Sequence, residues 1–209
     1  MEATKLVFIP AALSLGLALL TGPALAAGSE DPDWPCVQRQ VPEISAGMVW
    51  AGPPVDEAKG AGQATPEIRE LAKVIAARAT DMEDARTRIA AFAEGRGADR
   101  NAQLTRLFGT TLALVNRERN EVIAGIKRYA RRQASLAKKI EAMTADFNRL
   151  PIDGGEESER RREELQEQLN WDTRIFDERQ QSLVYVCETP VLLEQRVFAI
   201  SREIMNQLD

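Results

Sequence analysis

The sequence predicts an all-α protein: an elongated, antiparallel, three-helix bundle of the coiled-coil type, with a long projecting helical hairpin and an extended N-terminal segment that contains proline and tryptophan. Three observations lead to this fold class. Apolar residues recur every seven positions through most of the chain, which is the repeat of packed long helices. Proline and glycine cluster at a few positions between these stretches, and aromatic residues make up only 5% of the chain.

Residues 1–26 have the pattern of a signal peptide. Lys5 precedes an apolar run from Leu6 to Leu20, and Ala24-Leu25-Ala26 supplies the small residues that signal peptidase recognises. We expect cleavage after Ala26 and therefore a periplasmic or secreted protein. An uncleaved signal that anchors the chain in the inner membrane is the alternative, although the apolar run is short for a bilayer span.

Residues 27–64 form the N-terminal segment and a linker. Prolines at positions 32, 35, 42, 53 and 54 forbid a long helix here. Trp34 and Trp50 would nevertheless expose much apolar surface to water if this segment were free. We therefore expect residues 33–55 to lie as an extended belt along the helices, followed by a linker at 56–62. The functional alternative is a small-molecule site between belt and helices that Trp34 and Trp50 would line.

The chain contains two cysteines, Cys36 and Cys187. In an exported protein an even pair predicts a structural disulfide, here one that ties the belt to the last part of the chain. A redox or metal-binding pair is the alternative, but the spacing is not CxxC and no histidine is near.

A first helix is predicted over about 66–94 within the helical domain 65–209. Thr65 is a good N-cap and Pro66 suits the first helical position. Ile68, Ile75, Met82 and Ile89 form a heptad row, with Leu71, Ala85 and Phe92 in part of a second. Gly95 and Gly97 end this helix, and the short connection predicts that it runs antiparallel to the next, with its start beside about residue 128.

The second helix, 100–149, organises the fold. One apolar row recurs every seven residues, and a second falls four residues after members of the first. Arg119 and Gln133 are polar interruptions of the second row. The rows are Phe108, Val115, Val122, Tyr129, Leu136 and Met143, and Leu112, Ile126, Ile140 and Phe147.

The third helical stretch follows a reversal at Leu150-Pro-Ile-Asp-Gly-Gly155 and continues the repeat to the carboxyl terminus, with Asp172 and Arg179 as polar interruptions. Pro190 falls on its apolar seam, where it must kink the helix or divide it. We expect helices over about 157–188 and 190–208, with Thr189 capping the second.

A turn near Asp153 sets the register of the two long helices. It places Cys187 near Arg119 and sets the basic stretch 127–139 against residues 167–179, which include Glu167, Asp172, Asp177 and Glu178. We interpret this as charge pairing within the chain rather than as an anion-binding patch. The first helix covers only half of this rod, so residues 132–175 should project as a two-helix hairpin. Its candidate partner-binding residues are Arg132, Lys138, Lys139, Arg160, Arg161 and Trp171.

The sequence contains no recognisable catalytic constellation. Histidine is absent and the net charge is −5, which argues against histidine-based catalysis, zinc or haem ligation, and general nucleic-acid binding. A carboxylate di-metal site in the helices is disfavoured because such bundles use Glu-x-x-His. We expect no enzyme activity, no metal and no cofactor.

These features predict an exported, non-enzymatic interaction protein, whether scaffold, adaptor or chaperone-like, that acts through its long helices. Its partner would be another envelope protein or a second copy bound through the hairpin. The alternative is a binding module for a small or amphiphilic ligand held between the tryptophan-containing segment and the helices.

Overall fold

The computed structural model describes residues 31–55 and 64–209. Its elements are α1 (Ala46–Val49), α2 (Pro66–Ala76), α3 (Met82–Ala93), the short 3-10 helix η1 (Gly97–Asp99), α4 (Arg100–Arg149) and α5 (Gly155–Met205). These described ranges contain no strand, which confirms the predicted all-α class. The predicted signal peptide and the predicted linker 56–62 lie outside the described residues.

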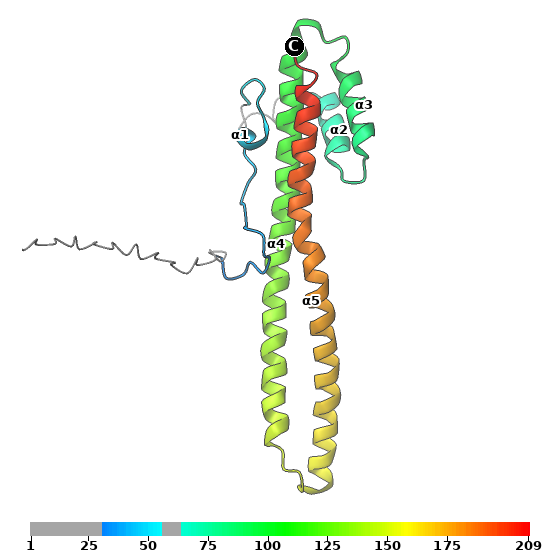
Figure 1. Cartoon of the computed structure of the whole chain (residues 1–209). Coiled ribbons are helices and arrows are strands. Elements are labelled where there is room, and N and C mark those ends of the chain that lie inside the picture. The colour runs from blue at the N-terminus through cyan, green and yellow to red at the C-terminus, as the bar shows by residue number, and fades with distance from the viewer. Residues whose placement is uncertain (1–30, 56–63) are drawn as a thin grey trace, which may run out of the picture.

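Helices α4 and α5 form a long antiparallel pair that runs the length of the molecule (Figure 1). At about 1.5 Å per residue, the 50 residues of α4 span about 75 Å. The other helices lie only at the end that holds the carboxyl terminus. We call residues 31–55, 64–131 and 176–209 the body, and residues 132–175 the hairpin.

The predicted first helix is two helices, so the expectation of one continuous helix over 66–94 is wrong. Ala77 has extended backbone angles that end α2, and the Asp81 side chain caps α3 by accepting a hydrogen bond from the Glu83 amide at 2.8 Å. The carbonyls at the end of α2 bind side chains instead: the Thr80 hydroxyl donates to Val74 O, and the Arg196 guanidinium donates to Ile75 O. The break is therefore stabilised at both of its ends.

Because of this break, α2 and α3 contact a different part of the α4–α5 pair from the one predicted. The Arg96 side chain contacts both Glu67, at the start of α2, and Gln103 of α4, whereas Arg78, just beyond α2, pairs with Glu118. Helix α2 therefore runs parallel to α4, and α3 returns beside α5. The start of α2 lies near residue 103 and not near residue 128 as expected.

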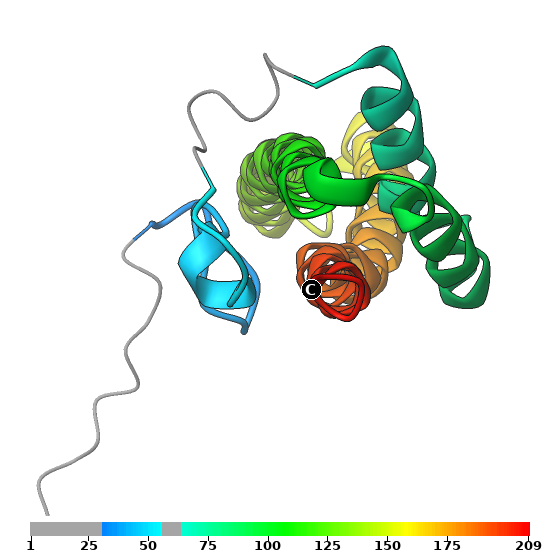
Figure 2. The ribbon, with the colours of Figure 1, turned by 90° about the horizontal axis from the view of Figure 1, so that it is seen from above.

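The belt lies along α4 and α5 on the side opposite α2 and α3 (Figure 2). Asn116 holds its middle, because the side-chain amide accepts from the Ile44 amide at 3.1 Å and donates to the Ile44 carbonyl at 2.8 Å. Near the carboxyl terminus the Ser201 hydroxyl donates to Val49 O at 2.6 Å. The predicted packing of residues 33–55 along the helices is confirmed.

Helix α5 is continuous from Gly155 to Met205, so the predicted division into 157–188 and 190–208 does not occur. Pro190 has no amide hydrogen to donate to the Val186 carbonyl. It is buried, however, and buried Cys187 and Leu193 flank it, so packing on both sides keeps the helix continuous. Thr189 lies within the helix and is not a cap.

The apolar core lies in the body and draws on the belt and on all four longer helices. Its largest members are Ile44, Ile68, Ile75, Ile89, Phe92, Leu104, Leu107, Phe108, Leu112, Val115, Leu193, Val197, Ile200 and Ile204. Seam residues that the heptad pattern identified in the body, such as Ile68, Ile75 and Ile89, are thus core residues even where the predicted helix is broken, whereas Leu71 and Met82 are half-buried beside the core.

Candidate interaction site

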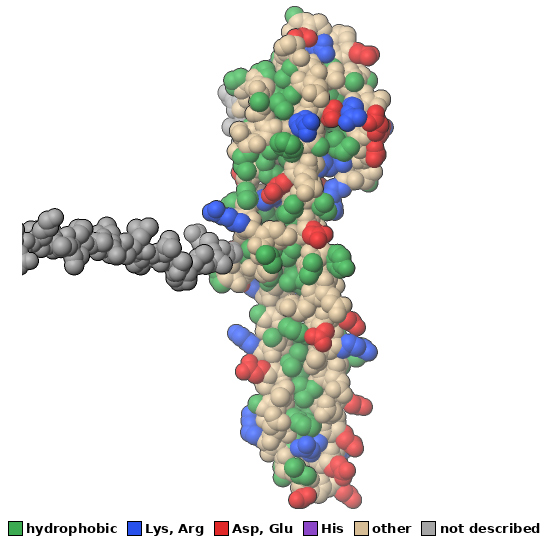
Figure 3. Space-filling view, viewed as in Figure 1, with side chains coloured by type: hydrophobic (Ala, Val, Ile, Leu, Met, Phe, Trp, Pro, Cys, Tyr) green, Lys and Arg blue, Asp and Glu red, His purple; other side chains and the backbone are tan. Residues whose placement is uncertain are grey.

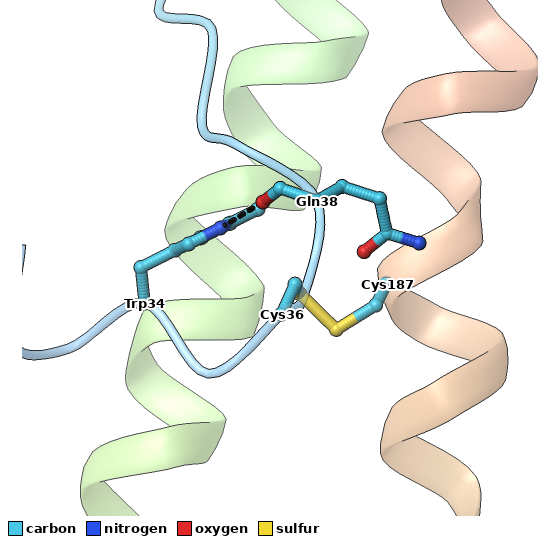
Figure 4. Close-up of a disulfide and its surroundings, with 4 residues drawn as sticks. All are labelled: Trp34, Cys36, Gln38 and Cys187. Carbon is cyan, nitrogen blue, oxygen red and sulfur yellow. Dashed lines mark hydrogen bonds between the residues drawn. A yellow bond between two sulfur atoms is a disulfide. The ribbon is translucent and has the colours of Figure 1, made fainter. Parts of the chain in front are cut away.

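A disulfide joins the belt to α5 at the lower end of the body (Figure 4). Cys36 and Cys187 are 151 positions apart in the sequence, and their Cα atoms are 5.6 Å apart. The Trp34 indole N–H donates to the Gln38 carbonyl at 2.7 Å and closes the turn that presents Cys36. The predicted pairing is confirmed, and it fixes the belt where the body gives way to the hairpin.

The two tryptophans of the belt lie in different clusters. Trp34 is buried against Ile123 and Ile126 beside the disulfide. Trp50 stacks on Phe108 with ring centroids 4.2 Å apart, and its indole N–H donates to the Pro53 carbonyl. Each ring therefore packs on α4, and each indole N–H donates to a backbone carbonyl of the belt. Both features are typical of tryptophans that hold a segment against a helix. The ligand-binding role of Trp34 and Trp50 stays a prediction.

Arg119 is a structural residue whose role the sequence did not indicate. It interrupts the apolar row of α4 but is only 2% exposed. Its guanidinium donates to the Val41 and Pro42 carbonyls of the belt and forms an ion pair with Glu194 of α5 at 2.6 Å. A charged residue on a coiled-coil seam needs buried partners, and that need is the signal that could have found this contact.

The register between α4 and α5 is shifted by a few residues from the predicted one. Arg119 meets Glu194 instead of Cys187. Farther along, the Tyr129 hydroxyl donates to the Arg179 carbonyl at 2.8 Å. Lys139 lies beside Asp172, so stretch 127–139 faces a segment that runs from 172 past 179 and only partly overlaps the predicted 167–179.

The charge pairing of that basic stretch differs from the prediction. Lys127 pairs with Asp31 at 2.6 Å and Arg131 with Asp33 at 2.7 Å, so the first partners belong to the belt. Only Lys139 pairs with an acid of α5. The sequence identified pairing within the chain, but it could not show that the end of the belt would reach α4.

The hairpin is a two-helix structure whose seam is only partly covered. Most apolar seam residues in it are half-buried, with Leu165 the buried exception at 7% exposed, and Figure 3 shows hydrophobic side chains reaching the surface along the line between the two helices. The half-buried seam residues are Leu136, Ile140, Met143 and Phe147 on α4 and Leu169 and Ile175 on α5.

Two buried polar residues cross-link the hairpin. The Gln133 side-chain amide donates to the Phe176 carbonyl at 3.1 Å. Asp172 is 6% exposed and forms an ion pair with Lys139 at 2.8 Å. The Lys139 ammonium lowers the pKa of the Asp172 carboxyl and outweighs burial, which raises it. Such polar layers fix helix register at the cost of apolar burial.

The far end of the hairpin is closed by cation–π and carbonyl contacts. The Arg162 guanidinium lies 4.4 Å from the centre of the Phe147 ring and donates to the Leu150 carbonyl. Gly155, with φ of 75°, supplies the left-handed conformation that begins α5. Ile152, at the turn, is 86% exposed.

The six candidate partner-binding residues do not form one patch. Lys139, Arg160 and Arg161 pair with Asp172, Glu157 and Glu164. Arg132 and Lys138 are exposed and form no ion pair within the described ranges. Trp171 is 54% exposed and stacks under Arg174, with 4.7 Å between guanidinium and ring centre. The contribution of these residues to binding stays a prediction.

Within residues 31–55 and 64–209, no group of three or more cysteine, aspartate or glutamate residues is arranged to hold a metal ion. None of the helices in the same ranges is both long enough and apolar enough to cross a bilayer. No protein-family model, no curated protein and no solved structure matches this chain.

Proposed function

We propose that this chain is an exported, non-enzymatic interaction protein, a scaffold, adaptor or chaperone-like factor whose hairpin engages another envelope protein. The observation that carries the proposal is the half-buried seam of residues 132–175, which no other described segment covers. A helical partner laid along this seam would bury the apolar residues that α4 and α5 leave partly open.

Three features of the sequence support the remaining parts of the proposal. The leader with its Ala24-Leu25-Ala26 site supports export, and the cysteine pair suits an oxidising compartment. The absence of histidine, together with the lack of a known catalytic motif, supports a role without chemistry. Amino-terminal sequencing of the protein isolated from the whole cell envelope should begin at Ala27, and a start at Met1 in the membrane fraction would favour the anchored alternative.

The hairpin's role is tested by removing it. Residues 132–175 are replaced by a short Gly-Ser turn, and the variant is compared with the full chain after crosslinking in cells and affinity capture. We expect the truncated protein to remain exported and disulfide-bonded but to lose partners that the full chain captures. The control is Arg88→Ala, which alters an exposed side chain of α3 and should leave the captured partners unchanged. Retention of every partner by the truncated protein would redirect attention to the belt and its tryptophans.

A further inference from the structure

Helix α5 carries a second seven-residue repeat that is separate from its core seam. Val184, Val191 and Phe198 form one row, and Tyr185, Leu192 and Ala199 form a second row one residue later. We call these six residues the α5 stripe. The core seam uses other positions, namely Cys187, Pro190, Leu193, Val197, Ile200 and Ile204. A seven-residue repeat of apolar side chains is the pattern of a helix that packs against another helix.

The α5 stripe is exposed in the body, where other faces of α5 are covered. Val184, Tyr185, Leu192 and Phe198 are 61%, 74%, 47% and 49% exposed. Helix α5 lies between α1 on one side and α3 on the other (Figure 2), and Figure 3 shows hydrophobic side chains at the surface of this part of the molecule. Scattered apolar residues are ordinary on a protein surface, but a repeated row of large ones is a mark of an interface.

Polar residues with the same spacing indicate what covers the stripe. Glu188, Gln195 and Arg202 also recur every seven residues and are exposed. Neither Glu188 nor Arg202 forms an ion pair within the described part of the chain. If a second α5 lies antiparallel with Gln195 opposite Gln195, each Glu188 faces an Arg202. The same register sets Leu192 against Phe198.

We propose that the α5 stripe is the interface of a homodimer in which two copies of α5 pack antiparallel about a two-fold axis at Gln195. The charges select this direction, because a parallel two-fold pair would set Glu188 against Glu188 and Arg202 against Arg202. The two hairpins then point in opposite directions and remain free. This interface goes beyond the proposed hairpin function and does not depend on it.

The size of the stripe sets the expected strength of the dimer. With the axis at Gln195, residues 184–199 of one copy face residues 191–206 of the other, so the two helices overlap over about 33 Å, which is short beside the interfaces of permanent dimers. We therefore expect a reversible, concentration-dependent dimer. Sedimentation equilibrium of the exported, disulfide-bonded protein should show monomer and dimer exchanging with concentration.

Charge reversal tests the interface directly. Glu188→Arg alone and Arg202→Glu alone each create like-charge contacts twice in the symmetric dimer, and each should raise the dissociation constant at least tenfold. An equimolar mixture of the two single variants, and the double variant alone, should recover dimers within about threefold of the native constant. Glu163→Arg, an exposed residue of the hairpin without an ion pair, is the matched control and should have no effect.

An apolar substitution separates the stripe from general surface effects. Leu192→Asp should abolish the dimer, whereas Ile152→Asp, at the exposed hairpin turn, should not. Circular dichroism of each variant should match that of the native protein, since all these side chains are exposed or nearly half exposed. If Leu192→Asp loses helix, Leu192→Ser is tested in its place, and it should lose the dimer as well.

Small-angle scattering tests the direction of pairing. An antiparallel dimer centred at Gln195 extends about 60 Å to each hairpin end, so its maximum dimension should be about 120 Å, against about 80 Å for a parallel dimer. A native protein that stays monomeric at high concentration would overturn the proposal, even if it binds lipid vesicles through the stripe. A dimer that ignores the charge reversals, or a parallel one, would overturn it too.

Discussion

The body and the hairpin are built on the same two helices with the same apolar repeat, yet they differ in how much of it they bury. Phe108 and Val115 are fully buried in the body, whereas Leu136 and Met143, in the same row of α4, are half-buried in the hairpin. The body adds α2, α3 and the belt around the pair, and the hairpin has no such cover in the described ranges. A heptad row therefore identifies the face of a helix that packs, but the number of neighbours decides how far that face is buried.

The polar residues on the seam differ in the same way. In the body, Asn116 and Arg119 bind the belt backbone and so hold a third layer against the helices. In the hairpin, Gln133 and Asp172 bind across the pair of helices. Polar seam residues thus fix the docking of an extra segment in one region and the register of two helices in the other.

The largest expected difference between the regions comes from matched truncations of isoleucine. Ile200→Ala in the core should lower the free energy of unfolding by about 2–5 kcal/mol, because Ile200 is fully buried among well-packed neighbours. Ile140→Ala in the hairpin should cost about 1 kcal/mol or less, since that side chain is half-buried and water can fill the space. Chemical denaturation of both variants measures the contrast, and equal losses would mean that the hairpin is covered as fully as the body.

Loss of the disulfide should act on the belt more than on the rod. Cys36→Ser with Cys187→Ser removes a crosslink across 151 positions and should cost about 2–4 kcal/mol. Trp34 should then become more exposed before α4 and α5 unfold, because the heptad contacts are local. Tryptophan fluorescence and far-ultraviolet circular dichroism should show separate transitions. A single coincident transition in the variant would show that belt and rod unfold as one unit.

Two glycines provide a smaller contrast within the body. A Cβ atom at Gly52 would lie 2.5 Å from the Trp50 ring and 2.9 Å from the Leu208 side chain, so Gly52→Ala should destabilise the protein by about 1–3 kcal/mol. Gly125, inside α4, has only the end of the Arg128 side chain nearby, at 3.8 Å. Gly125→Ala should therefore stabilise the protein by about 0.5–1 kcal/mol through helix propensity. Thermal melts of the two variants should move in opposite directions.

The smallest expected effect is the pH dependence that Asp172 gives to the hairpin. Because the Lys139 ammonium lowers the pKa of Asp172 below its unfolded value of about 3.9, the contribution of this pair is complete above that pH and is lost as the pH falls through the folded pKa. Hydrogen exchange of peptides from 132–149, corrected for intrinsic rate, should show protection that is complete at pH 6 and falls as the pH is lowered below about 3.9. Asp172→Asn should remove most of this pH dependence, and exposed Asp177→Asn should not.

Most of the fold could be predicted because its determinants are local. The heptad rows, the turn at 150–155 and the cysteine pair gave the helix pairing, the hairpin and the disulfide. The break at Ala77 was missed because the apolar row continues through Met82 and concealed the local N-cap signal of Asp81, whose partner is the nearby Glu83 amide. The Arg196 contact to Ile75, by contrast, depends on a neighbour far away in the sequence. The roles of Asn116 and Arg119 were missed for the same reason, since their partners lie more than 70 positions away.

The continuity of α5 at Pro190 shows a limit of local rules. The missing hydrogen bond predicts a weak point, but the helix also carries buried residues on both sides and a disulfide beside the proline. Packing therefore outweighs the local cost of about 3 kcal/mol that proline has inside a helix. No local signal in the sequence measures that balance.

Native-state hydrogen exchange along α4 tests the central claim most directly, because one helix passes through both regions. Amides from 104 to 126 should exchange only through unfolding of the whole body, whereas those from 132 to 149 should exchange through opening of the hairpin alone. The expected difference in protection is at least tenfold at pH 7, and it should persist as denaturant is added until the body itself unfolds. Uniform protection along the whole of α4 would contradict the division of the molecule into a covered body and an open hairpin.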